Sequence, residues 1–154
     1  MNESDMIQDG RTLVLLADGR RARGYVEPRR GAKLAEAAEW ALQISEEELI
    51  APQDRAPRSF DRVGAGRHAM DGGAVPHEEE ERRFLARVAQ RLAAATQAKT
   101  FDHLVIAAPP RALGILREAL PDKTRALIRF EIAKDIVDED AGAVAKRLAD
   151  LRIP

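Results

Sequence analysis

The sequence contains no cysteine, few aromatic residues and no long apolar run. Without cysteine, a disulfide framework, a thiolate metal site and a cysteine nucleophile are all excluded. No apolar stretch approaches the roughly 20 residues that a membrane-spanning helix needs, so no membrane span is predicted. Aromatic residues make up only 4% of the chain, so the core must be built from alanine, leucine, valine and isoleucine.

A strong excess of charge is also missing. The 25 lysine and arginine residues nearly balance the 26 aspartate and glutamate residues, which gives a net charge of -1. This balance argues against a uniformly basic nucleic-acid binder but leaves room for a local basic patch. Residues 1–10 are acidic and polar, unlike a signal peptide, so we expect a loose leader and a cytoplasmic protein. A length of 154 residues predicts a single domain over 1–154.

Hydrophobic patterns predict five strands and three helices in the order β-β-β-α-β-α-β-α. The strands fall at residues 12–17, 22–27, 33–44, 104–107 and 127–137, and the helices at 77–98, 110–120 and 140–151. Residues 33–44 also suit a helix by composition, and we favour a strand because the segment closely follows a hairpin. The order predicts an α/β, ribonuclease-H-like fold. Its mixed five-stranded sheet combines an antiparallel three-strand meander with two βα units, with helices packed on it.

The first and fourth predicted strands are apolar on both faces, as expected for neighbours in the middle of a sheet. The fourth ends on small residues and turns through Pro109 and Pro110 into a helix. Ligand crevices of α/β domains open at the carboxyl ends of such strands. Arg111 lies there, at a helix N-terminus, and can either bind an anion or pair with a carboxylate such as Asp18.

Residues 51–76 form the least regular stretch, rich in glycine, proline and arginine. A compact domain rarely carries so long a loop unless it is functional or disordered. The two hypotheses are a disordered surface loop and a loop that binds an anionic or protein partner. The candidate contact residues in and beside it are Arg58, Arg62, Arg67, His68, Gly72, Gly73 and His77.

Four glutamates, residues 78–81, open the helix predicted at 77–98. We interpret them as first-turn carboxylates that face the positive end of the helix dipole, with His77 as a helix-start residue. The spacing also predicts the i,i+4 ion pairs Glu78–Arg82 and Glu79–Arg83.

Motifs for catalysis are scarce. A ribonuclease-H-type nuclease needs carboxylates on its first and fourth strands, and neither predicted strand carries one. No serine lies in a G-x-S-x-G context, and no phosphate-binding glycine motif occurs. We therefore predict no catalytic residue, no metal site and no cofactor. The remaining catalytic alternative is a hydrolase that uses His68, Asp71 and His77 around the loop.

Four stretches together resemble one bacterial family. They are LVLLADGRRARGY (13–25), RSFDRVGAGRHAM (58–70), PHEEEERRFLARVAQRL (76–92) and FDHLVIAAPPRALGILREAL (101–120). They resemble the host attachment proteins, also called proteins required for attachment to host cells, and they occur in the same order as in that family. The resemblance implies a domain similar to the middle domain of archaeal and eukaryotic peptide chain release factors and Pelota, and so a link to ribosomes or tRNA.

Release factors work through a GGQ loop before a long helix, whereas this sequence reads Gly72-Gly73-Ala74 and lacks the glutamine. The leading hypothesis is therefore a non-enzymatic domain that binds an anionic partner, ribosomal RNA or tRNA, through its basic loop and Arg111. The alternative is a protein-interaction module in attachment or its regulation. The sequence leaves the oligomeric state open.

Overall fold

The computed structural model describes residues 9–50 and 65–153, and within helix α2 it describes side chains from His77 onward. The elements are β1 (Thr12–Ala17), β2 (Arg21–Glu27), β3 (Ala35–Glu36), the 3-10 helix η1 (Ala38–Trp40), β4 (Leu42–Gln43), α2 (Ala65–Gln97), β5 (His103–Ala107), α3 (Pro110–Ala119), α4 (Asp122–Arg125), β6 (Ile128–Ile132) and α5 (Ala141–Leu151). The mixed α/β class is confirmed. The ribonuclease-H-like and release-factor-like identity of the fold stays a prediction.

The described strands form a six-stranded sheet in the order β3-β2-β1-β5-β6, with β4 also paired to β2. β1 is antiparallel to β2 and parallel to β5, which is in turn parallel to β6. The predicted adjacency of the first and fourth strands is therefore confirmed, as β1 beside β5. Every residue of these two strands is buried, because both faces of the central sheet are covered.

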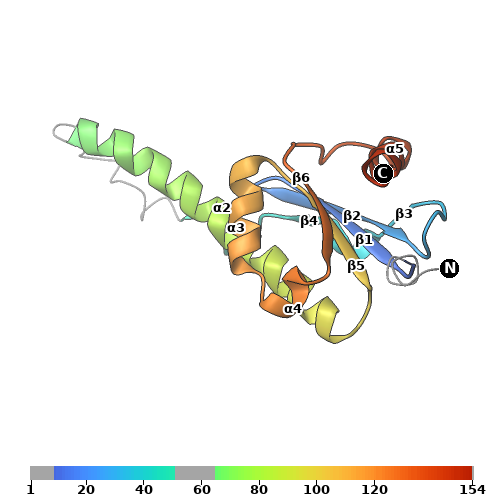
Figure 1. Cartoon of the computed structure of the whole chain (residues 1–154). Helices are drawn as coiled ribbons and strands as arrows, with labels where there is room; N and C mark the ends of the chain where they lie inside the picture. Colours follow the sequence, from blue (N-terminus) through green and yellow to red (C-terminus); the bar gives the residue numbers. More distant parts are fainter. Residues whose placement is uncertain (1–8, 51–64, 154) are drawn as a thin grey trace.

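Alternate residues of the central strands belong to two different hydrophobic clusters. Leu15 and Ile106 belong to a cluster that includes residues of α2 and α3, whereas Val14 and Val105 belong to one that includes residues of α5. The period of two along each strand therefore places α2 and α3 on one face of the sheet and α5 on the other (Figure 1). The result is three layers, with the sheet between helices.

The single third strand predicted for residues 33–44 is wrong. The segment forms two short strands, β3 and β4, separated by η1. The 3-10 turn lets Trp40 fold into the core directly over Gly24 of β2, where a Cβ added to the glycine would lie 2.6 Å from the Cβ of Trp40. Side-chain packing of one aromatic residue thus overrides the alternating pattern of the segment.

The loop predicted for residues 51–76 is wrong in its second part, because α2 begins at Ala65 and not at His77. The loop prediction treats Gly72, Gly73 and Pro76 as residues that end a helix. Glycine weakens a helix by only about 1 kcal/mol, and a proline inside a helix removes one hydrogen bond, so these residues weaken a helix without necessarily ending it. Residues 51–64 lie outside the described chain.

The C-terminal part differs only in detail from the prediction. β6 ends at Ile132, although Ile136 and Val137 beyond it are still buried. α5 begins where predicted, because the Asp140 side chain accepts a hydrogen bond from the N–H of Ala143 at 2.9 Å and caps the helix.

Candidate functional site

The carboxyl end of the sheet, where the sequence places a crevice, is occupied by ion pairs. Arg111, in the first turn of α3, donates to Glu78 of α2 at 3.2 Å, and both side chains are about half exposed. Arg111 therefore pairs with a carboxylate, but not with Asp18. The Asp18 side chain instead accepts from the backbone N–H groups of Arg20 and Arg21 and closes the β1–β2 turn.

Glu80 is the buried carboxylate of this region, with only 1% of its side chain exposed. Its Oε2 accepts from the backbone N–H of Ile50 at 3.0 Å. Its Oε1 lies 3.7 Å from Arg20 Nη1 and 3.6 Å from His77 Nδ1. Because α2 begins at Ala65, the predicted role of residues 78–81 as first-turn partners of the helix dipole is wrong, and Glu80 instead ties α2 to the sheet and to Ile50.

Arginines and carboxylates alternate around this end of the molecule. The described pairs are Arg20–Glu80, Arg21–Asp138, Arg23–Glu36, Arg83–Glu79 and Arg111–Glu78. The hydrogen bond from Arg21 to Asp138 is strong enough to raise the pKa of the guanidinium. A nucleic-acid backbone would have to displace these carboxylates to reach the arginines, whereas a protein surface can match both signs of charge.

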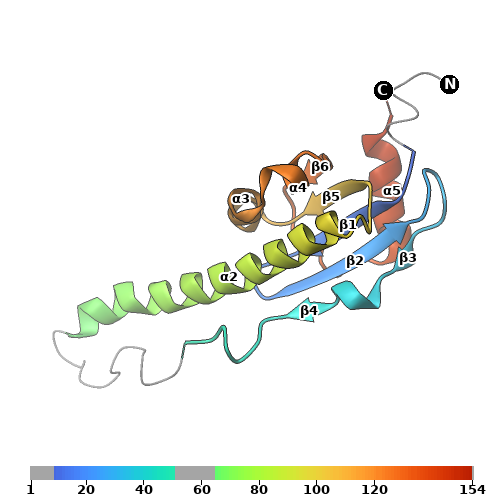
Figure 2. The ribbon, with the colours of Figure 1, turned by 90° about the horizontal axis from the view of Figure 1, so that it is seen from below.

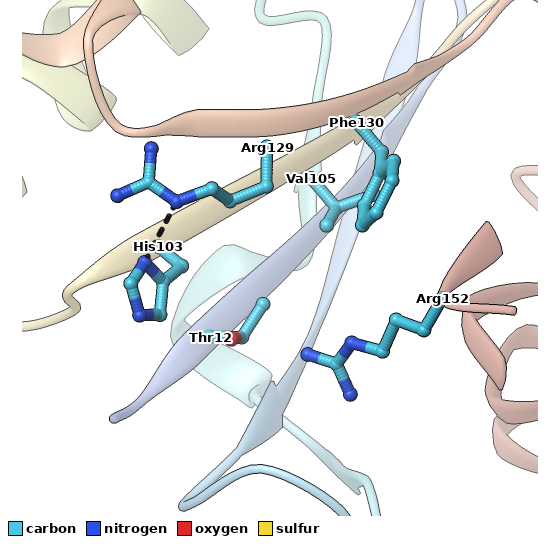
Figure 3. A pocket seen from close by; sticks show the side chains of 6 residues that line it. All are labelled: Thr12, His103, Val105, Arg129, Phe130 and Arg152. Carbon is cyan, nitrogen blue, oxygen red and sulfur yellow. Dashed lines mark hydrogen bonds between the residues drawn. The ribbon is translucent and has the colours of Figure 1, made fainter. Parts of the chain in front are cut away.

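A second feature lies at the opposite, amino end of the parallel strands. A cavity of about 190 Å³ opens there, lined by Thr12, His103, Val105, Arg129, Phe130 and Arg152 (Figure 3). Thr12 and His103 are the first residues of β1 and β5, which are hydrogen-bonded neighbours. The cavity therefore opens over the sheet on the face that α5 covers.

His103 and Arg129 form a hydrogen-bonded chain on one side of this cavity. The His103 Nε2 lies 2.9 Å from the carbonyl oxygen of Asp9, and its Nδ1 lies 3.0 Å from Arg129 Nε. A carbonyl oxygen only accepts and a guanidinium only donates. The ring is thus neutral, with its proton on Nε2, and Nδ1 accepts from Arg129.

The comparison with family models decides the family of the chain. Residues 13–148 match the family described as protein required for attachment to host cells. The chain belongs to this host attachment family. A comparison with curated proteins finds no match.

The structure of this host attachment family member describes some of the predicted site residues and not others. Arg58 and Arg62 lie outside the described residues, and Arg67, His68, Gly72 and Gly73 lie on α2 where side chains are not described. His77 is exposed, in mid-helix and not at a helix start. The pair Glu79–Arg83 forms at 3.4 Å, whereas Glu78 contacts Arg111 in place of Arg82.

Three cavity residues of the host attachment domain escape sequence analysis. Strict alternation along the strand predicted at 127–137 would put Arg129 on the face opposite Ile128 and Phe130. The register between β5 and β6 shifts instead, so that Leu104 pairs with Ile128 and Val105 with Phe130. Thr12 and Arg152 carry no sequence signal of function. The one available signal was His103, a histidine at the start of a buried strand.

The described part of the chain has neither a membrane-spanning helix nor a metal-binding cluster. No helix there is both long enough and apolar enough to cross a membrane. No group of three histidine, aspartate or glutamate side chains in the same residues could hold a metal ion.

Proposed function

We propose that this chain is a non-catalytic binding domain in attachment to host cells, and that its contact element is the N-terminal end of α2. The α2 arm, defined as residues 65–76, is that part of the helix. In this proposal the arm contacts a protein partner. Membership of the host attachment family supports the attachment role.

The single observation that supports this proposal is the projection of α2 beyond the sheet (Figures 1 and 2). The helix is anchored by buried side chains from Glu80 onward, chiefly Phe84, Leu85, Val88 and Leu92. Twelve residues of helix before His77 correspond to a reach of roughly 18 Å. A helix end in this position presents a contact surface at a distance from the core.

The ion pairs at the base of the arm favour a protein partner over nucleic acid. Arg20, Arg83 and Arg111 are each within ion-pair distance of a glutamate. The exposed pairs Arg83–Glu79 and Arg111–Glu78 add little stability, but pairs of this kind help to set which partners are accepted. Binding of ribosomal RNA or tRNA would therefore have to use residues other than these three arginines.

The structure allows a clean excision of the arm. Ile50 N–H donates to Glu80 Oε2 at 3.0 Å, so the described segments on either side of residues 51–76 lie close together. Residues 51–76, the arm together with the segment that precedes it, can therefore be replaced by a linker of about six glycine and serine residues, which spans ~13 Å. The matched control is Arg125→Gln, a substitution of an exposed arginine on α4.

Both variants are compared with wild type in bacteria that lack the gene, with adhesion to host cells as the readout. We expect both variants to fold, and only the excised variant to lose adhesion. Adhesion at the wild-type level without residues 51–76 would refute the proposal. Thermal unfolding of each purified variant separates loss of contact from loss of fold.

Co-sedimentation with ribosomes, at low and high salt, tests the competing partner class. We expect no salt-sensitive association. Salt-sensitive association that is lost when Arg58, Arg62 and Arg67 are changed to alanine would replace the protein partner by RNA, since contacts to phosphates weaken steeply with salt.

A further inference from the structure

We propose that the cavity at the amino end of the sheet binds a small organic anion, a carboxylate or phosphate group carried on a short apolar body. This site is independent of the α2 arm and lies at the other end of the strands. Four features of its lining support the proposal, and each concerns a different property of the ligand.

The first feature is a guanidinium without a carboxylate partner. Among the described residues, Arg129 donates only to neutral groups, His103 Nδ1 and the carbonyl oxygen of Ala126, both at 3.0 Å. A guanidinium has five N–H groups, so three remain for a ligand. Planar donors of this kind match the oxygens of a carboxylate or phosphate.

The backbone of β6 sets the direction in which the Arg129 side chain points. Between the pairs Leu104–Ile128 and Val105–Phe130, β6 advances two residues while β5 advances one. Arg129 is therefore the extra residue of a β-bulge. Bulges occur next to binding sites because they redirect one side chain out of the regular alternation. His103, itself 4% exposed, then holds the guanidinium through Nε.

The second feature is the charge balance of the lining. Arg152 also borders the cavity, but both of its terminal nitrogens donate to Glu27, at 2.8 and 2.9 Å. The charge of Arg152 is thus neutralised by a buried carboxylate, and the positive charge of Arg129 remains. No carboxylate is among the described lining residues. One negative charge on the ligand restores neutrality.

The third feature is the hydroxyl of Thr12. The residue is 1% exposed, and within the described structure its Oγ1 is buried without a hydrogen-bond partner. A buried hydroxyl without a partner is unfavourable and uncommon. Figure 3 shows Thr12 between the His103–Arg129 pair and Arg152. An oxygen of the bound anion can accept a hydrogen bond from this hydroxyl.

The fourth feature is the apolar part of the wall, formed by Val105 and Phe130. It offers no partner for charge but can pack against a hydrocarbon or aromatic body. The volume of about 190 Å³ corresponds to roughly six water molecules at about 30 Å³ each. This is the scale of benzoate or phenyl phosphate.

The test titrates the purified protein with four probes: benzoate, acetate, phenyl phosphate and inorganic phosphate. Binding is followed by calorimetry and by NMR of the His103 ring, which contacts Arg129 directly. The variants are Arg129→Gln and Thr12→Val, and the matched control is Arg125→Gln. Arg125 is exposed on the neighbouring α4, where it pairs with Asp122. Phosphate can stabilise any protein by exclusion from its surface, so only differences between variants count.

We expect benzoate or phenyl phosphate to bind wild type and Arg125→Gln equally and to shift the His103 signals. Arg129→Gln should weaken this binding about ten- to hundredfold, because a charged hydrogen bond is lost. Thr12→Val should weaken it by a smaller factor while the free protein unfolds at the same or a higher temperature, because an unpartnered hydroxyl has been removed. The better of the two aromatic probes identifies the head group.

Two outcomes would overturn the proposal. One is that no probe shifts the His103 signals of the wild-type protein at millimolar concentration. The other is that Arg129→Gln binds as tightly as Arg125→Gln, which would place binding elsewhere. If acetate and inorganic phosphate bind as well as their aromatic counterparts, the anion site stands and the apolar body is refuted. The folded state of Arg129→Gln is verified by its thermal unfolding.

Discussion

Arg152 closes two hydrogen bonds on Glu27, at 2.8 and 2.9 Å, across 125 residues of sequence. Glu27 ends β2 and is only 3% exposed, and its Oε2 also accepts from the N–H of Gly31 at 3.1 Å. Arg152 follows the last turn of α5. This pair therefore joins the C-terminal helix to the sheet beside the cavity at the amino end of the parallel strands.

Removing one member of this pair should destabilise the protein strongly. Arg152→Ala leaves the Glu27 carboxylate buried without a cation, and we expect a loss of about 3 kcal/mol in the free energy of unfolding. Urea unfolding followed by circular dichroism measures it. Arg125→Ala breaks the exposed pair with Asp122 and should change stability by less than about 0.5 kcal/mol. Equal effects of the two substitutions would show that burial of Glu27 does not matter.

Two glycines should respond to alanine in opposite directions. At Gly24 an added Cβ would meet Trp40 at 2.6 Å, so Gly24→Ala should destabilise the protein by about 1–3 kcal/mol. At Gly114, inside α3, nothing lies within 4 Å of an added Cβ. Gly114→Ala should therefore stabilise by about 0.5–1 kcal/mol through helix propensity. The midpoints of thermal unfolding decide both signs, and a stable Gly24→Ala variant would contradict the described packing of η1.

Acid should weaken the attachment of α5 to the chain before it. Hydrogen bonds from Arg147 to Glu139, at 2.7 and 2.8 Å, lower the pKa of this carboxyl below its ordinary value. A carboxyl with a lowered pKa in the folded state contributes stability above its unfolded pKa of about 4.3 and loses it as pH falls through the folded value.

The free energy of unfolding should therefore fall below about pH 4.3, and Glu139→Gln should show a shallower fall in this range. Arg147→Met should have the same effect, because it removes the partner that lowers the pKa. Urea titrations between neutral pH and about pH 3 measure both. An unchanged slope in both variants would assign the acid sensitivity to other carboxyls.

The cap of α5 offers a local test of helix stability. Asp140→Ala removes the hydrogen bond to the N–H of Ala143 and should cost about 1 kcal/mol. Asp150→Ala, in the last turn of the same helix, removes a negative charge from the negative end of the helix dipole. That control should be neutral or slightly stabilising. Differential scanning calorimetry separates the two, and a reversed order would contradict the assigned cap.

Sequence analysis succeeded where one local pattern decides the structure. The unbroken apolar runs predicted β1 and β5 as neighbours in the middle of the sheet, and Pro110 marked the start of α3. It failed at residues 33–44 because the pattern does not record that Trp40 packs over Gly24. It failed at residues 65–76 because glycine and proline weaken a helix without necessarily ending it.

The candidate sites divide in the same way. Arg111 was predicted at the end of a central strand, but only the structure identifies Glu78 as its partner. The cavity at the amino end of the parallel strands was missed because its residues come from both ends of the chain, from Thr12 to Arg152. The bulge that redirects Arg129 is a mismatch between two strands, and neither strand alone contains it.

The sequence by itself determined the α/β class, the family, the central strands and the absence of cysteine chemistry, because each depends on composition or on local periodicity. Only the tertiary structure decided which charges are neutralised and which are not. Glu27 neutralises Arg152 from 125 residues away, while Arg129 meets a neutral histidine. Electrostatic partners are set by distance in space, and distances between remote segments exist only after the chain has folded.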